Sequence, residues 1–130
     1  MSKPCPPVTA SVRNVTVTVN AKGKPSFSVN PIVVDQADTL IVFALNAADY
    51  RFPTDGSALQ VTGTDTPSRD AADGQFPMAW LIDERTLALQ DRNDSALAPS
   101  LRYACTVAVE HIQTGERSSH DPGIENNNQR

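Results

Sequence analysis

The sequence lacks the features that mark several large functional classes. No segment approaches the ~18 consecutive apolar residues of a membrane-spanning helix, so we expect no membrane partner. No apolar signal-peptide core follows the first residues, so we expect a cytoplasmic protein. The formal net charge is −4 and the Lys and Arg residues are scattered, which argues against nucleic acid as a partner.

Cysteine is scarce, with only Cys5 and Cys105 in the chain. Without an export signal, two cysteines are more typical of free thiols than of a disulfide. A bridge between the two remains the alternative, and it would close a loop of roughly 100 residues.

Aromatic residues make up only 5% of the chain, so we expect most of them in the core. Tyr50, Phe52, Phe76 and Trp80 flank expected loops, where they form a candidate sugar-stacking or protein-binding patch.

What the sequence does contain favours one small all-β domain over residues 1–130. It has 130 residues, 39% of them hydrophobic, and it has 10 Pro with few segments of helical periodicity. Residues 1–10 predict an extended leader because three prolines favour a polyproline-like path. Residues 113–130 predict a polar tail that frays at its end.

The segment 39–46 is the expected centre of the fold. Its six consecutive apolar residues, Leu40 to Leu45, are bounded by Asp38 and Asn46. A short run of branched and aromatic residues between turn residues predicts a strand buried on both faces.

Other segments show the period of two that is typical of half-buried strands. Val15, Val17 and Val19 alternate with threonines, and residues 101–112 predict the longest strand. Counted along the chain, about seven or eight short strands with turns between them predict a two-sheet antiparallel sandwich. The expected topology is Ig-like or cupredoxin-like.

The order of these strands, with a cysteine and a histidine near the last one, resembles the cupredoxin arrangement. That resemblance implies copper held by cysteine and histidine, with Cys105, His111 and His120 as the ligand types. A straight strand would nevertheless separate Cys105 from His111 by roughly 20 Å, too far for one ion. The alternative is that Cys105 is a small core residue and His111 caps its strand, so we expect no bound cofactor.

The string Ser-Ser-His-Asp-Pro-Gly-Ile-Glu-Asn over 118–126 is the most distinctive local motif. Through Asp121-Pro122 it resembles the DP-EP family of small bacterial proteins of unknown function. The resemblance implies a sandwich fold with no assigned activity. Turn chemistry explains the residues themselves, because Asp121 can cap a turn, Pro122 fixes φ and Gly123 permits positive φ. Ile124 would then pin the tail to the body, and Asp121 is also a candidate binding residue.

Two further groups of polar residues are candidates for chemistry. Residues 91–95 offer oxygen ligands but lack the Gly and distal Glu of a calcium loop, which favours a solvated turn. Carboxylates in the expected loops leave a small hydrolase or isomerase as one alternative; they are Asp35, Asp38, Asp49 and Asp55.

The absence of a consistent catalytic or metal constellation decides our main prediction. We expect a non-enzymatic structural or interaction module whose partner is protein, above all further copies of itself, because sandwiches offer sheet edges for pairing. A copper-binding or redox protein is the first alternative, and a small hydrolase or isomerase is the second.

Overall fold

The computed structural model describes residues 11–64, 79–93 and 100–127, and these residues form eleven strands and no helix. The strands are β1 (Ser11–Val19), β2 (Pro25–Phe27), β3 (Ile32–Val34), β4 (Thr39–Leu45), β5 (Tyr50–Arg51), β6 (Leu59–Thr64), β7 (Ala79–Asp83), β8 (Thr86–Asp91), β9 (Ser100–His111), β10 (Arg117–His120) and β11 (Gly123–Asn127). In the described part of the chain no helix could therefore cross a membrane. The predicted leader over 1–10 lies outside the described residues.

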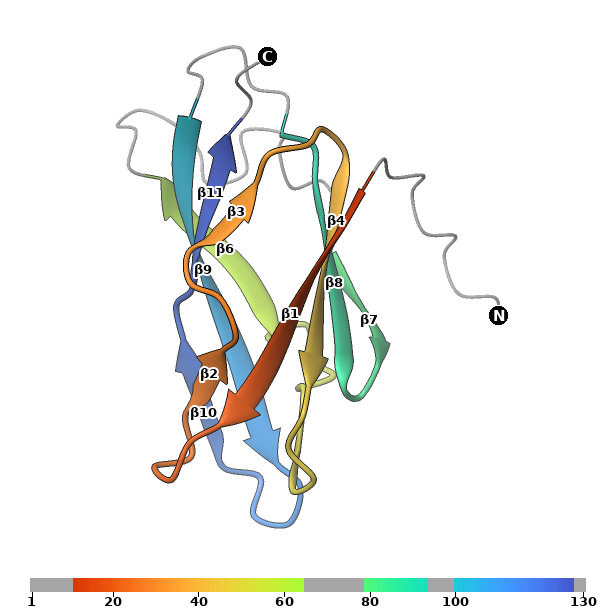
Figure 1. Cartoon of the computed structure of the whole chain (residues 1–130). Helices are drawn as coiled ribbons and strands as arrows, with labels where there is room; N and C mark the ends of the chain where they lie inside the picture. The colour runs from red at the N-terminus through yellow and green to blue at the C-terminus, as the bar shows by residue number, and fades with distance from the viewer. Residues whose placement is uncertain (1–10, 65–78, 94–99, 128–130) are drawn as a thin grey trace.

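The strands form the expected two packed sheets (Figure 1). Sheet A has five strands in the order β2-β1-β4-β8-β7. Sheet B has six strands: β9 pairs with β5, β6, β10 and β11, and β3 pairs with β11. The all-β sandwich is confirmed, while the strand count is higher than predicted because short strands such as β2, β3 and β5 carry too few residues to show a period.

The prediction of purely antiparallel sheets is wrong, because both sheets are mixed. In sheet A, β1 and β4 run parallel, with Val15 in register with Phe43. In sheet B, β11 and β3 run parallel, with Ile124 in register with Ile32. The chain leaves sheet A after β2, adds β3 to sheet B and returns as β4, which is the crossover that a parallel pair requires.

Strand β4 lies at the centre of sheet A, but only one of its faces is buried. Ile41, Phe43 and Leu45 point into the sandwich and are at most 6% exposed. Leu40 and Val42 on the opposite face are half-buried. The prediction of burial on both faces is therefore wrong, since no element of the described structure forms a third layer over sheet A.

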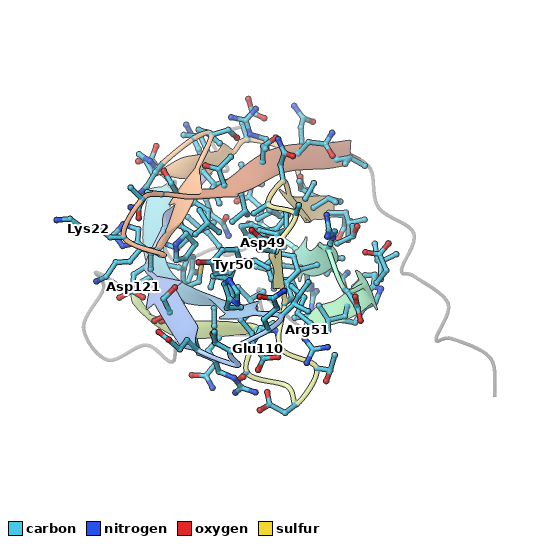
Figure 2. All side chains as sticks on the ribbon, turned by 90° about the horizontal axis from the view of Figure 1, so that it is seen from below. Lys22, Asp49, Tyr50, Arg51, Glu110 and Asp121 are labelled. Carbon is cyan, nitrogen blue, oxygen red and sulfur yellow. The ribbon has the colours of Figure 1, made fainter. Side chains whose placement is uncertain are left out.

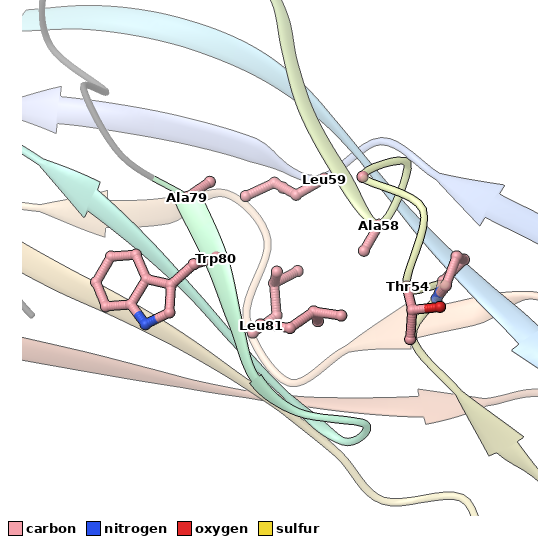
Figure 3. Close-up of a pocket in the computed structure, with 9 residues that line it drawn as sticks. Thr54, Ala58, Leu59, Ala79, Trp80 and Leu81 are labelled. Carbon is pink, nitrogen blue, oxygen red and sulfur yellow. The ribbon is translucent and has the colours of Figure 1, made fainter. Parts of the chain in front are cut away.

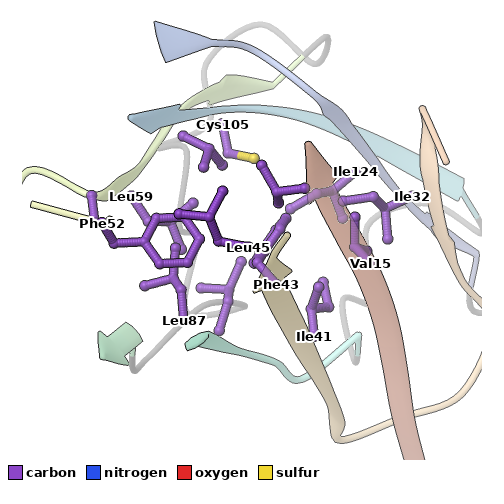
Figure 4. Packing of buried hydrophobic residues seen from close by; sticks show 14 of the residues in the cluster. Val15, Ile32, Ile41, Phe43, Leu45, Phe52, Leu59, Leu87, Cys105 and Ile124 are labelled. Carbon is purple, nitrogen blue, oxygen red and sulfur yellow. The ribbon is translucent and has the colours of Figure 1, made fainter. Parts of the chain in front are cut away.

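The core lies between the inner faces of the two sheets (Figure 4). Its largest fully buried side chains include Phe43 from sheet A and Phe52 from the segment after β5. Cys105, Val107 and Val109 of β9 complete it from sheet B, because alternate residues of a strand share a face.

The end of the tail was expected to fray from Asn126, but Asn126 and Asn127 belong to β11, and residues 128–130 lie outside the described residues. β11 lies between β9 and β3 in the interior of sheet B, and β10 pairs with β9. Ile124 is completely buried, so it does fasten the tail to the body. Gly123 is a strand residue without positive φ, in contrast to the turn that we predicted. A polar composition was misleading here because the backbone of β11, not its side chains, makes most of the connection.

A buried polar cluster, made of Asp91, Asn93 and Asn126, joins the two sheets at the end opposite the β9–β10 hairpin. Asn126 Nδ2 donates to Asp91 Oδ1 at 2.7 Å. Asn93 Nδ2 donates to the carbonyls of Val34, Gln36 and Asn127, each at 3.2 Å. Asp91 and Asn93 are at most 1% exposed, so the predicted solvated turn over 91–95 is wrong for its first residues.

Candidate functional site

The three predicted copper ligands lie in three different local environments and do not converge on one point. Cys105 Sγ faces the core and donates to the Pro122 carbonyl at 3.4 Å. His111 packs against Tyr50, and His120 stacks on Phe27 with ring centroids 6.1 Å apart. Within the described residues no three His, Cys, Asp or Glu side chains are grouped to hold a metal ion.

Cys105 has the chemistry of a core residue. Burial, and to a smaller extent the charge of Asp121, raises the pKa of its thiol to about 12. A metal ligand or nucleophile must be a thiolate, which this environment disfavours. The described residues thus agree with our alternative interpretation, in which Cys105 is a small hydrophobic residue of the core.

His111 closes the hairpin between β9 and β10. Its Nδ1 accepts hydrogen bonds from the backbone N–H groups of Gln113 and Thr114, both at 3.3 Å. The ring meets Tyr50 edge-on, with centroids 5.0 Å apart and planes at 84°. His111 therefore caps the end of its strand, as the alternative to the copper site proposed.

The predicted aromatic patch does not form. Phe52 is completely buried in the core, so it cannot offer a binding surface. Tyr50 is half-buried on β5 of sheet B, whereas Trp80 is half-buried on β7 of sheet A. Phe76 lies outside the described residues. Sequence reasoning placed Phe52 on the surface because it follows a loop, but it belongs to the first inward position after β5.

A hollow of about 450 Å³ lies at the end of the sandwich that contains Tyr50 (Figure 2). Three connections meet there, which are the β1–β2 turn, the β4–β5 loop and the β9–β10 hairpin (Figure 1). Tyr50 and His111 line the hollow, and its charged lining residues are Lys22, Lys24, Glu116 and Arg117.

An ion-pair network lies beside this hollow. The Glu110 carboxylate accepts from Arg51 at 2.8 Å and from Arg117 Nε at 2.9 Å. Arg117 also reaches Asp55 at 2.8 Å, and the Ser57 hydroxyl donates to the same aspartate. The hydrogen bonds from Arg117 and then Arg51 lower the pKa of Glu110, and the bonds from Ser57 and Arg117 lower the pKa of Asp55 to about 2.

This network has a structural explanation. It ties β5, β9 and β10 to the loop after Phe52, and every carboxylate in it has a cationic partner. General acid or base catalysis needs a carboxyl group whose pKa is moved toward neutrality, and here both shifts go the other way.

The remaining loop carboxylates also do not form a site. Asp35 and Asp38 belong to the β3–β4 connection, and Asp49 to the β4–β5 loop. All three are exposed, as is Asp121 between β10 and β11. Exposed carboxylates are ordinarily solvated, so the described structure offers no observation in favour of the hydrolase or isomerase alternative.

The outer face of sheet A, like that of sheet B, has no further layer of the described structure over it. Side chains that share this face follow from the strand registers, because paired residues in neighbouring strands point to the same side. Val42 of β4 is flanked by Asn14 of β1 and Ala88 of β8, and Ala88 is flanked by Trp80 of β7. By these registers the outer face of sheet A comprises Val12, Asn14, Thr16, Thr18, Ser26, Leu40, Val42, Ala44, Trp80, Asp83, Thr86, Ala88 and Gln90, where Asp83 pairs with Thr86 after an irregularity in β7.

Asp83, at the hairpin end of the edge strand β7, is the only one of these residues that carries a charge, in a chain of which 20% is charged. Val12 is 57% exposed, the largest exposed fraction among the large hydrophobic residues of the described structure. Leu40, Val42 and Trp80 are half-buried. Figure 3 shows the indole of Trp80 on the opposite side of β7 from Leu81, which points into the sandwich.

From the sequence we identified the apolar run that contributes to this surface, but we did not predict that half of the run faces outward. The six-residue apolar run Leu40–Leu45 supplies hydrophobic residues to both faces of β4, where a strand with one wet face would alternate with polar residues. We interpreted the run as a strand that its own chain buries on both faces. The structure covers only the inner half of that run, which leaves the outer half to be explained.

The sequence was compared with family models and with curated proteins. No family model matches the sequence. No curated protein matches it either. The resemblance to the DP-EP family and to cupredoxins therefore stays a prediction from a few residues.

Proposed function

We propose that this protein is a non-enzymatic interaction module that binds protein, above all further copies of itself. One observation carries the proposal: the outer face of sheet A has a single charge, at Asp83, is apolar at its centre, and has no further layer of the described residues over it. Contiguous apolar surface rimmed by polar residues marks interaction sites on soluble proteins. Here Leu40, Val42 and Trp80 form the centre, and threonines and Gln90 lie around them.

Molar mass in solution tests the proposal. We expect static light scattering to give more than the chain mass of 14.0 kDa at high concentration, and a decrease toward that mass on dilution. Val42→Lys should lower the mass at high concentration to that of one chain, because a buried unpaired charge is costly in an apolar interface.

Val33→Lys provides the matched control. Val33 is a strand valine that is 38% exposed, but it lies on β3 of sheet B. This variant should associate as the unchanged protein does. A mass of 14.0 kDa for the unchanged protein at every concentration would contradict self-association.

A further inference from the structure

We infer that two copies of the chain pack face to face through the outer face of sheet A, around a two-fold axis that passes at Val42. The inference rests on the proposed function and specifies its partner and its geometry. It follows from three properties of this face, which are its charge, its size and the position of its centre.

The charge of the face favours a second copy as the occupant. In a two-fold interface the same surface meets itself, so every charge on it approaches a charge of its own sign. The chain has a net charge of −4, and most of its surface would repel a copy. The outer face of sheet A escapes most of this repulsion, because only Asp83, at the end of the edge strand β7, carries a charged side chain there, and no charge lies on β1, β4 or β8 of this face.

The size of the face predicts a dimer of modest stability. Four neighbouring strands, β1, β4, β8 and β7, span roughly 20 Å at about 4.8 Å each, and six residues of a strand span a further ~20 Å. The footprint is then roughly 400 Å², before side-chain relief is added, against about 800 Å² per partner in a standard interface. We therefore expect dissociation on dilution and not a permanent dimer.

The position of Val42 fixes which residue meets itself. Val42 is the middle residue of β4, and β4 is the middle strand of sheet A. A two-fold axis that relates two facing sheets lies in the plane between them. Complete overlap of the two faces places the axis at their centre, and the residue there is then opposite its own copy whatever direction the axis takes in that plane. Face-to-face packing of sheets at ~10 Å brings two such side chains into contact.

A charge-pair experiment tests this geometry. We would prepare Val42→Lys and Val42→Glu and measure the mass of each alone and of an equimolar mixture, at a concentration where the unchanged protein is dimeric. Each variant alone should have the mass of one chain, because like charges meet at the axis. The mixture should recover twice the chain mass of 14.0 kDa, because lysine then meets glutamate.

Each outcome has a separate meaning. If the unchanged protein is monomeric throughout, both the proposed function and this inference are wrong. If Val42→Lys dissociates the dimer but the mixture does not re-form it, the face is an interface and the axis lies elsewhere. If both variants stay dimeric, another surface makes the dimer. Ala44→Lys and Ala44→Glu, at an exposed position two residues along β4, repeat the test should either Val42 variant fail to fold.

Discussion

At the scale of single residues, Asn93 shows how one side chain can connect distant segments. Its amide nitrogen donates to three carbonyls, from residues before β4 and from the end of β11. Asn93 also has φ of 47°, a left-handed conformation that Asn and Asp tolerate better than other non-glycine residues. One residue that follows β8 of sheet A thereby satisfies backbone carbonyls of sheet B and of the β3–β4 connection.

Replacing Asn93 with Asp should destabilise the fold strongly. Aspartate keeps the size and the tolerance of positive φ but cannot donate, so buried carbonyls lose their partner and a charge is added. We expect a loss of about 2–4 kcal/mol in the free energy of unfolding, measured by urea denaturation. Asp38→Asn is the matched control, since Asp38 has φ of 51° on an exposed turn and should change stability little. Equal effects of the two substitutions would contradict this role.

Cys105 should be chemically inert in the folded protein. Its thiol is fully buried, and burial raises its pKa to about 12, so almost no thiolate exists near pH 8. In a Cys5→Ser background we expect no reaction with a thiol reagent until denaturant is added. Added Cu(II) should produce no visible thiolate band. A band that disappears in Cys105→Ser would instead support the copper-binding alternative.

At the scale of structural elements, the ion pairs of Glu110 connect strands that the sequence places far apart. Arg51 of β5 and Arg117 of β10 both donate to the carboxylate of Glu110 on β9. These bonds lower the pKa of Glu110 below its ordinary value of 4.5. A group whose pKa is lowered on folding stabilises the protein above its ordinary pKa, and that contribution is lost as the pH falls.

We therefore expect the urea midpoint to fall as the pH decreases below 4.5, with Asp55 contributing down to about pH 2. Glu110→Gln should be less stable at neutral pH and show a flatter dependence over this acidic range. Glu116→Gln, on the exposed β9–β10 hairpin, is the control and should keep the slope of the unchanged protein. Parallel profiles for all three proteins would contradict the assignment.

β11 is the element whose importance is least visible in the sequence. It lies between β9 and β3, so its removal would separate β3 from the rest of sheet B. Ile124→Ala should cost about 2–5 kcal/mol of folding free energy, because the side chain is completely buried. Val33→Ala, in the adjacent exposed position of β3, should cost much less when both are measured by chemical denaturation. A small effect of Ile124→Ala would mean that the tail is only loosely attached.

At the scale of the whole molecule, association through the outer face of sheet A should couple to folding. A partner that binds only the folded chain stabilises it, and the effect grows with concentration. The melting temperature of the unchanged protein should thus rise with protein concentration, whereas that of Val42→Lys should not. Calorimetry over a hundredfold concentration range would measure this, with Val33→Lys expected to follow the unchanged protein. No dependence in the unchanged protein would contradict the coupling.

The sequence by itself determined the secondary structure class and most inward-facing residues. Alternation in β1 and β9 marked Val15, Val17, Cys105 and Val107 correctly, because the period of a strand is a local property. The core role of Cys105 also followed from its position within an alternating strand. Turn residues such as Gly23, at φ of 79°, were recognisable because they need conformations that few residues adopt.

Only the tertiary structure decided strand partners, the parallel pairs and the role of the tail. Parallel pairing of β1 with β4 depends on where β3 docks, which no local pattern records. The inward position of Phe52 and the clustering of Asp91, Asn93 and Asn126 depend likewise on contacts between distant segments. The apolar run predicts that both faces of β4 are apolar. Which faces are covered depends on the arrangement of layers, and the described layers cover the inner face.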